Sequence, residues 1–166
     1  MNQQNRDKLL STATFSPCRT WRYTLTRRWD DGPQIAFIGL NPSTADETED
    51  DPTIRRCIGF AKREGAGGLV MLNLFAFRAT DPKAMKAALD PVGPDNDLHI
   101  RLGIQSSMLA ICCWGSHGVF QNRSARIRNG LKQEGHADKL RCLGKTKSGA
   151  PKHPLYLKSD TPLEAF

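Results

Sequence analysis

Short apolar segments alternate along this chain with segments of helical periodicity. The apolar runs at 34–40, 69–74 and 109–114 have the length and residue types of buried strands, and 140–143 is a shorter run of the same kind. The segments between and after them predict helices at 52–64, 81–89, 95–106 and 124–133. Strands that alternate with helices favour a mostly parallel sheet with helices on both faces.

An antiparallel hairpin is expected ahead of this pattern. Residues 21–29 (WRYTLTRRW) are rich in aromatic and β-prone types, and the turn 30–33 (DDGP) separates them from the strand at 34–40. We therefore expect an α/β fold of three layers, α/β/α, with a mostly parallel four-stranded central sheet plus an antiparallel N-terminal hairpin. A chain of 166 residues is long enough for one well-packed domain, and we expect residues 1–166 to form a single domain.

The composition excludes several classes of protein. With 39% apolar and 25% charged residues and a mean hydropathy of -0.49, the chain is too apolar to be disordered and too polar for a membrane protein. Residues 1–8 are polar and lack the apolar centre of a secretory signal. Five cysteines without a C-x-x-C pair and four scattered histidines predict neither disulfides nor a metal site. We expect a cytoplasmic protein with no metal, no cofactor and no membrane partner.

Positive charge is concentrated in one segment. The formal net charge is +7, and nine of the basic residues lie between Gly118 and His153 against only two acidic ones. Such an excess attracts polyanions such as nucleic acid, and it is equally typical of a solvated face. The basic residues of the segment are Arg123, Arg126, Arg128, Lys132, Lys139, Arg141, Lys145, Lys147 and Lys152.

Polar clusters follow the predicted strands. Parallel sheets bind ligands beyond the carboxyl ends of their strands, where loops and helix N-termini converge. The chain carries GLNPST after the strand at 34–40, NLFAFR at the end of 69–74 and WGSH at the end of 109–114. A fourth cluster, GAPKHP at 149–154, follows the last strand. We expect these four clusters to share one edge of the sheet.

Four of these segments resemble, in order and spacing, the motifs of the uracil-DNA glycosylase superfamily. They are GLNPS at 39–43, LVMLNLFAFR at 69–78, CWGSH at 113–117 and HP at 153–154. The chain as a whole also resembles an uncharacterised bacterial domain family of unknown activity that carries GLNPST and a terminal HPLYL. The resemblance spans 35–157 and implies a uracil-DNA glycosylase-like fold.

The resemblance to the glycosylases implies an N-glycosylase, a hydrolase that removes a base from DNA. The catalytic residues would be Asn41, which positions the attacking water, and His153, which donates a hydrogen bond to the departing base. Asn73 would read the edge of the base with its amide, and Phe75 or Phe77 would stack against the ring. On the residues alone, Asn41 is also typical of a turn or helix cap, and Asn73 of a buried amide that satisfies loop backbone.

The resemblance also implies contacts with the DNA backbone. Hydroxyl groups near the predicted rim and one lysine would bind phosphates, and the two residues after His153-Pro154 would wedge into the space left by an extruded nucleotide. The phosphate-binding candidates are Ser43, Thr44, Ser116 and Lys152, and the wedge candidates are Leu155 and Tyr156.

Two departures keep other functions open. The superfamily usually has serine after the His-Pro pair, where this chain has Leu155, and the acidic loop 46–51 would repel a phosphate backbone. Both features favour a free nucleoside or nucleotide as the ligand, with a divalent ion at Asp46 and Asp51 as one variant of that hypothesis. The third hypothesis is a non-catalytic domain that binds nucleic acid through the basic segment 118–153.

Overall fold

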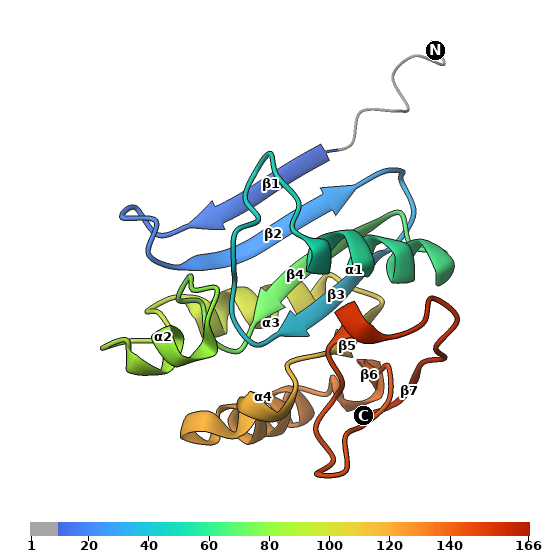
Figure 1. Ribbon diagram of the computed structural model, residues 1–166. Helices are drawn as coiled ribbons and strands as arrows, with labels where there is room; N and C mark the ends of the chain where they lie inside the picture. Colours follow the sequence, from blue (N-terminus) through green and yellow to red (C-terminus); the bar gives the residue numbers. More distant parts are fainter. Residues whose placement is uncertain (1–9) are drawn as a thin grey trace.

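The computed structural model describes residues 10–166, and these form an α/β fold around one mixed sheet (Figure 1). The seven strands lie in the order β1-β2-β4-β3-β5-β6-β7. They are β1 (Leu10–Phe15), β2 (Arg22–Arg28), β3 (Gln34–Gly39), β4 (Gly68–Asn73), β5 (Leu109–Cys112), β6 (Leu140–Cys142) and β7 (Glu164–Ala165).

The central strands are parallel, as the alternation of strands and helices predicts. β3 pairs in parallel with both β4 and β5, and β5 pairs in parallel with β6. Ile35 and Phe37 of β3 face one side of the sheet and Ala36 and Ile38 the other, so both faces of this strand are buried. The carboxyl ends of β3, β4, β5 and β6 therefore share one edge.

An antiparallel N-terminal hairpin is present, but its strands are β1 and β2, and residues 21–29 do not form the pairing with the strand at 34–40 that their sequence predicts. β2 pairs antiparallel with β1, and on its other side it pairs antiparallel with β4, where Leu25 lies opposite Met71. The strand at 34–40 follows β2 in the chain, yet it lies beyond β4 in the sheet. Because β2 runs against β4, the first residue of β2 lies at the edge where the parallel strands end.

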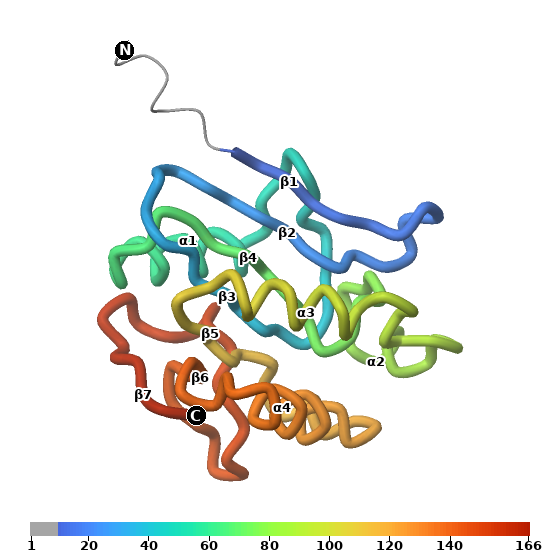
Figure 2. Tube along the Cα trace, turned by 180° about the vertical axis from the view of Figure 1, so that it is seen from behind, coloured from blue at the N-terminus to red at the C-terminus, as the bar shows by residue number. Residues whose placement is uncertain are grey.

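Helices cover the two faces of the sheet (Figures 1 and 2). On one face α1 (Pro52–Arg63) packs Ile54, Cys57 and Phe60 against the sheet. On the other face α3 (Asn96–Gln105) and α4 (Arg123–Gln133) contribute a second apolar cluster. The short helix α2 (Pro82–Ala87) and the 3-10 turns η2 (Ser116–Asn122), η3 (Ala137–Lys139) and η4 (Pro154–Tyr156) lie in the connections. In residues 10–166, no helix has the length and apolar character needed to cross a membrane.

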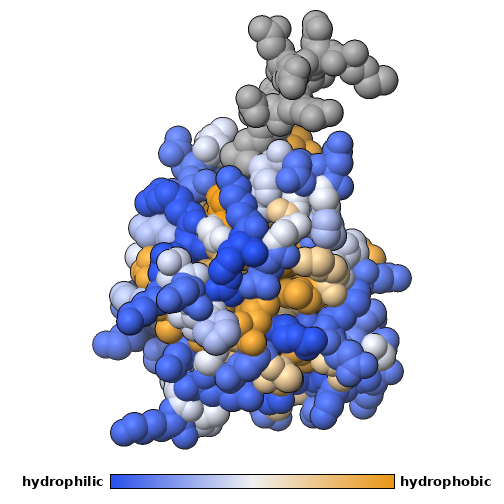
Figure 3. All heavy atoms as spheres, turned by 90° about the vertical axis from the view of Figure 1, so that its right-hand side faces the viewer, coloured by the Kyte–Doolittle hydropathy of each residue, from blue (hydrophilic) through white to orange (hydrophobic). Residues whose placement is uncertain are grey.

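The C-terminal segment is attached to α1 by two arginines. The Nη1 of Arg63 donates to the carbonyl oxygens of Ser159 (2.8 Å) and Thr161 (2.6 Å), and the Nη2 of Arg56 donates to that of Leu157. These contacts hold the η4 turn, which follows His153, beside α1. Figure 3 shows the side of the molecule that lies at the right in Figure 1, where apolar residues gather between hydrophilic ones.

Candidate functional site

A cavity of about 330 Å³ lies at the edge where the parallel strands end. Its size is in the range of pockets that bind small molecules. The loops after β3, β4 and β5 line it, together with the start of α1 and the segment before η4. Its polar lining residues are Arg22, Asn41, Ser43, Asp51, Thr53, Asn73, Thr80, Ser116, His117 and His153.

Asn73, the last residue of β4, lines this cavity and carries an amide without a partner among the described residues. Its side chain is 1% exposed, and neither Nδ2 nor Oδ1 has a hydrogen-bond partner among the described residues. Gly39 of the adjacent β3 leaves space for it, since a Cβ there would lie 2.9 Å from Oδ1 of Asn73. Buried polar groups are nearly always paired, so this amide is available to a ligand.

A second buried asparagine performs the structural role that Asn73 does not. The Nδ2 of Asn96, at the start of α3, donates to the carbonyl oxygens of Asn73 (3.0 Å) and Leu74 (3.1 Å). The Nε of Arg123 also donates to the Leu74 oxygen, at 2.7 Å, and the same guanidinium forms an ion pair with Asp97. These contacts fix the backbone that carries the Asn73 side chain.

Asn41 is oriented by its own loop. Its Nδ2 donates to the carbonyl oxygens of Ala79 (2.7 Å) and Pro42 (3.1 Å), which uses both hydrogens of the amide. The Oδ1 atom therefore remains to accept a hydrogen bond from a water or ligand in the cavity. The helix cap of the following segment is Asp51, whose Oδ1 accepts from the Ile54 N–H at 2.9 Å.

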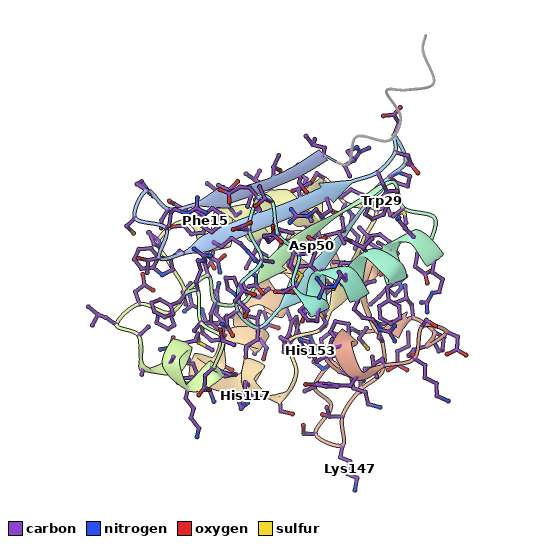
Figure 4. The ribbon with its side chains drawn as sticks, turned by 45° about the horizontal axis from the view of Figure 1, so that its top comes forward. Phe15, Trp29, Asp50, His117, Lys147 and His153 are labelled. Carbon is purple, nitrogen blue, oxygen red and sulfur yellow. The ribbon has the colours of Figure 1, made fainter. Side chains whose placement is uncertain are left out.

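His153 reaches the cavity from the C-terminal part of the chain (Figure 4). Its Nδ1 accepts a hydrogen bond from the Leu155 N–H at 3.3 Å, which leaves the proton of the neutral ring on Nε2. Burial lowers the pKa of His153, and the negative charge of Asp51 opposes part of that decrease. At neutral pH the ring is thus a neutral hydrogen-bond donor.

Arg22 lines the cavity although its sequence context gave it no role. Asp51, which the sequence offers with Asp46 as a ligand of a divalent ion in one variant of the nucleotide hypothesis, also lines the cavity. Arg22 stands at the start of β2, where the residues around it indicate only a strand; its Nη1 donates to the Ala45 oxygen at 2.7 Å. Burial lowers the pKa of Arg22 to about 10, so it remains charged at neutral pH.

The other expected base-binding and wedge residues are distributed differently. Phe75 is fully buried in the core, 5.7 Å from the Phe120 ring between centroids, and Phe77 is half-buried next to the core; neither lines the cavity. Leu155 is half-buried in η4 and Tyr156 is 86% exposed beside it.

The expected phosphate-binding residues divide into two groups. Ser43 and Ser116 line the cavity. Thr44 and Lys152 are exposed and do not line it. His117 lies next to Ser116 at the cavity, and its Nδ1 is 3.1 Å from the Lys86 Nζ of α2 (Figure 4).

The hairpin neutralises part of the acidic loop 46–51. Both guanidinium Nη atoms of Arg19 donate to the Glu47 carboxylate, at 2.8 and 3.0 Å, which lowers the pKa of Glu47 to about 2. The Nε of Arg27 donates to Asp50 at 2.8 Å. Within residues 10–166, no group of three or more His, Cys, Asp and Glu side chains is arranged to hold a metal ion. Two of the five carboxylates of the loop are therefore paired, so the loop presents fewer free charges than its sequence indicates, and Asp51 is its one residue that lines the cavity.

Part of the basic segment 118–153 serves the fold. Arg123 is 2% exposed. The Nζ of Lys139 donates to the carbonyl oxygens of Ile104 (3.0 Å) and Ser107 (2.8 Å) at the end of α3. A cation at a helix C-terminus satisfies carbonyls that have no partner within the helix. These two side chains are not available to nucleic acid.

Comparison with known proteins identifies a family for the chain. No curated protein and no solved structure matches it significantly. These comparisons do not link it to the uracil-DNA glycosylase superfamily, so that resemblance rests on the four sequence segments. The family described as "Protein of unknown function (DUF1643)" matches residues 22–155, a span that starts at Arg22 and includes His153. The chain therefore belongs to the DUF1643 family.

Proposed function

We propose that this protein hydrolyses the N-glycosidic bond of a base in DNA, the activity of the uracil-DNA glycosylase superfamily that its motifs resemble. One observation carries the proposal. Asn41, Asn73 and His153 come from three distant segments of the chain and line the same cavity. Each has the free polar atom that its role requires: an acceptor on Asn41, an amide on Asn73 and a donor on His153.

The chemistry follows from the charges that develop as the bond breaks. The sugar gains positive charge and the departing base gains negative charge, so hydrogen-bond donors must face the base and a water must face the sugar. The Nε2–H of His153 donates to the base oxygen that becomes negative. The Oδ1 of Asn41 accepts a hydrogen bond from the water whose oxygen bonds to the sugar carbon. The N-glycosidic bond breaks with its electron pair on the base, and the proton that the water loses passes through solvent to the departed base. An amide is a weak base, so Asn41 orients the water rather than deprotonating it, and we expect a modest rate.

Base selection falls to Asn73. A carboxamide offers a donor and an acceptor side by side, which matches the adjacent donor and acceptor of a pyrimidine edge. A ligand that pairs with both atoms satisfies two buried groups at once, whereas a ring without that edge leaves them unpaired. Leaving such groups unpaired costs about 1–3 kcal/mol, which favours the matching base.

Cleavage of modified oligonucleotides tests the proposal. Single- and double-stranded oligonucleotides that contain uracil or other altered bases are incubated with the protein and then heated in alkali, which cuts the strand at abasic sites. We expect the strand to be cut after treatment with the wild type and with the control variants Asn129→Ala and His136→Ala. We expect no cutting with Asn41→Ala and a strongly reduced yield with His153→Ala. Asn129 is exposed on α4, and both control residues lie outside the cavity. A panel that stays uncut refutes the proposal.

The second candidate is a free nucleoside or nucleotide as the substrate. Leu155 favours it, because it occupies the position where the superfamily usually has a phosphate-gripping serine. The acidic loop supports this candidate less than its sequence does, since Arg19 and Arg27 pair with two of its five carboxylates. A thermal-shift screen of nucleosides and nucleotides, with and without magnesium, tests it, because a ligand of the folded state raises the melting temperature. The absence of any shift at millimolar ligand excludes this candidate.

A further inference from the structure

Among the described residues, three arginine side chains are almost completely buried, and two of them have a carboxylate partner. Arg27 is paired with Asp50 at 2.8 Å, and Arg123 is paired with Asp97. Arg22 is 2% exposed, and no carboxylate oxygen of the described residues lies within 4.0 Å of its guanidinium nitrogens. Arg22 is also the member of this group that lines the cavity. A buried charge without a partner is unfavourable for folding, so it calls for a function.

The donors of Arg22 are only partly used. Nη1 donates to the Ala45 oxygen, whereas Nε is buried and has no partner among residues 10–166. The Nε side of a guanidinium is one of the edges that bind the two oxygens of a carboxylate or phosphate. Asp51 shares the cavity, and its negative charge acts on Arg22 from beyond ion-pair distance, while its Oδ1 is committed to the cap of α1.

Arg22 lies near the unused amide of Asn73. The backbone N–H of Arg22 donates to the Ala76 oxygen at 2.9 Å, three residues after Asn73, and both side chains line the cavity. One wall of the cavity therefore combines a cationic donor with a neutral donor and acceptor. A neutral base satisfies the amide alone.

We propose that the cavity binds a ligand in which a ring carries an anionic oxygen group, a carboxylate or a phosphate, and that this group binds Arg22 while the ring binds Asn73. The inference rests on the proposed function in one respect, that a ring ligand enters the cavity, and it does not depend on bond cleavage. Carboxylate on the ring and phosphate on an attached sugar share this chemistry, and the test separates them.

Binding of two matched pairs of probes tests the anionic group. The pairs are uracil with uracil-6-carboxylate, and uridine with uridine 5′-monophosphate, each titrated by calorimetry at low salt. We expect at least one anionic member to bind wild type at least about tenfold more tightly than its neutral partner, since charge-assisted hydrogen bonds are stronger than neutral ones. Tighter binding of uracil-6-carboxylate than of uracil indicates a ring carboxylate. Tighter binding of uridine 5′-monophosphate than of uridine indicates a phosphate. Arg22→Gln should abolish the preference, and Arg126→Gln, a change on the exposed face of α4, should retain it.

A stability measurement gives an independent readout. Arg22→Gln removes an unpaired buried charge and should leave the urea midpoint unchanged or raised, whereas Arg27→Gln and Arg123→Gln break ion pairs and should lower it. The inference is overturned if Arg22→Gln is destabilised as strongly as those two variants, if no probe binds, or if charged and neutral probes bind wild type equally. If neutral probes bind as tightly as charged ones, this inference fails but the proposed function is unaffected, because the oligonucleotide assay tests that function separately.

Discussion

Replacement of Asn73 by alanine should stabilise the protein while it removes the function of the site. The side chain is buried, and neither of its polar atoms has a partner among the described residues. An unpaired buried amide costs about 1–3 kcal/mol of folding free energy, which the substitution recovers. The truncation leaves no closed void, because the side chain borders an existing cavity. After subtraction of the lost packing contacts, we expect a net gain of about 1 kcal/mol.

The matched control is Asn96→Ala. Asn96 is as buried as Asn73 and its Oδ1 also lacks a partner among the described residues, but its Nδ2 makes two hydrogen bonds to backbone carbonyls. Each lost bond costs about 1 kcal/mol and removal of the unpaired Oδ1 offsets part of that cost, so we expect a net loss of about 1 kcal/mol. Urea unfolding followed by circular dichroism should therefore separate the two variants by about 2 kcal/mol, with opposite signs relative to wild type. If Asn73→Ala loses as much stability as Asn96→Ala, the Asn73 amide is structural and the reasoning is refuted.

Three further predictions concern other parts of the molecule. Gly39→Ala places a Cβ 2.6 Å from the nearest side-chain carbon, so it should lower the free energy of unfolding by about 1–3 kcal/mol in urea melts and weaken ligand binding. The control Gly59→Ala, whose Cβ meets nothing within 4 Å, should not destabilise the protein. Cys18, whose pKa is lowered to about 7 chiefly by a hydrogen bond with the Ser16 hydroxyl, should be the thiol that a chromogenic disulfide reagent modifies first in the folded protein, and Cys18→Ser should remove that fast phase. Burial lowers the pKa of His153 below its ordinary 6.5, so the unfolded chain binds the proton more readily than the folded protein does. The free energy of unfolding should therefore fall as the pH drops from about 6.5 through the lowered pKa, and it should fall less in His153→Gln. A pH dependence identical in both proteins would contradict this.

The helices and buried strands were predictable because their patterns are strong. The sequence predicts a helix at 52–64, and α1 spans Pro52–Arg63, since Asp51-Pro52 starts it and Gly65 ends it. β1 (Leu10–Phe15) was not predicted. It is a short edge strand whose inner residues 11–14 are the small types Ser, Thr, Ala and Thr, and its side chains alternate only between exposed and half-buried, so its sequence lacks apolar contrast.

The candidate site was predictable to the extent that it lies on parallel strands. Asn41 follows β3 and Asn73 ends β4, and the carboxyl ends of these two strands share an edge, which brings the residues together. Arg22 was not predictable in this way, because it belongs to an antiparallel strand whose beginning, not its end, reaches that edge. Phe75 shows the converse limit: its backbone N–H donates to the Leu40 oxygen at 2.9 Å, and its ring is buried in the core despite its place in a motif.

The cavity joins a residue near the start of the matched span, Arg22, with one near its end, His153. During synthesis Arg22 leaves the ribosome long before His153, so the cavity of a nascent chain stays incomplete until the segment that contains His153 has emerged. Contacts between such distant parts of a chain form slowly. Shortening the chain before His153 would thus produce a protein with most of its sheet and no complete binding site.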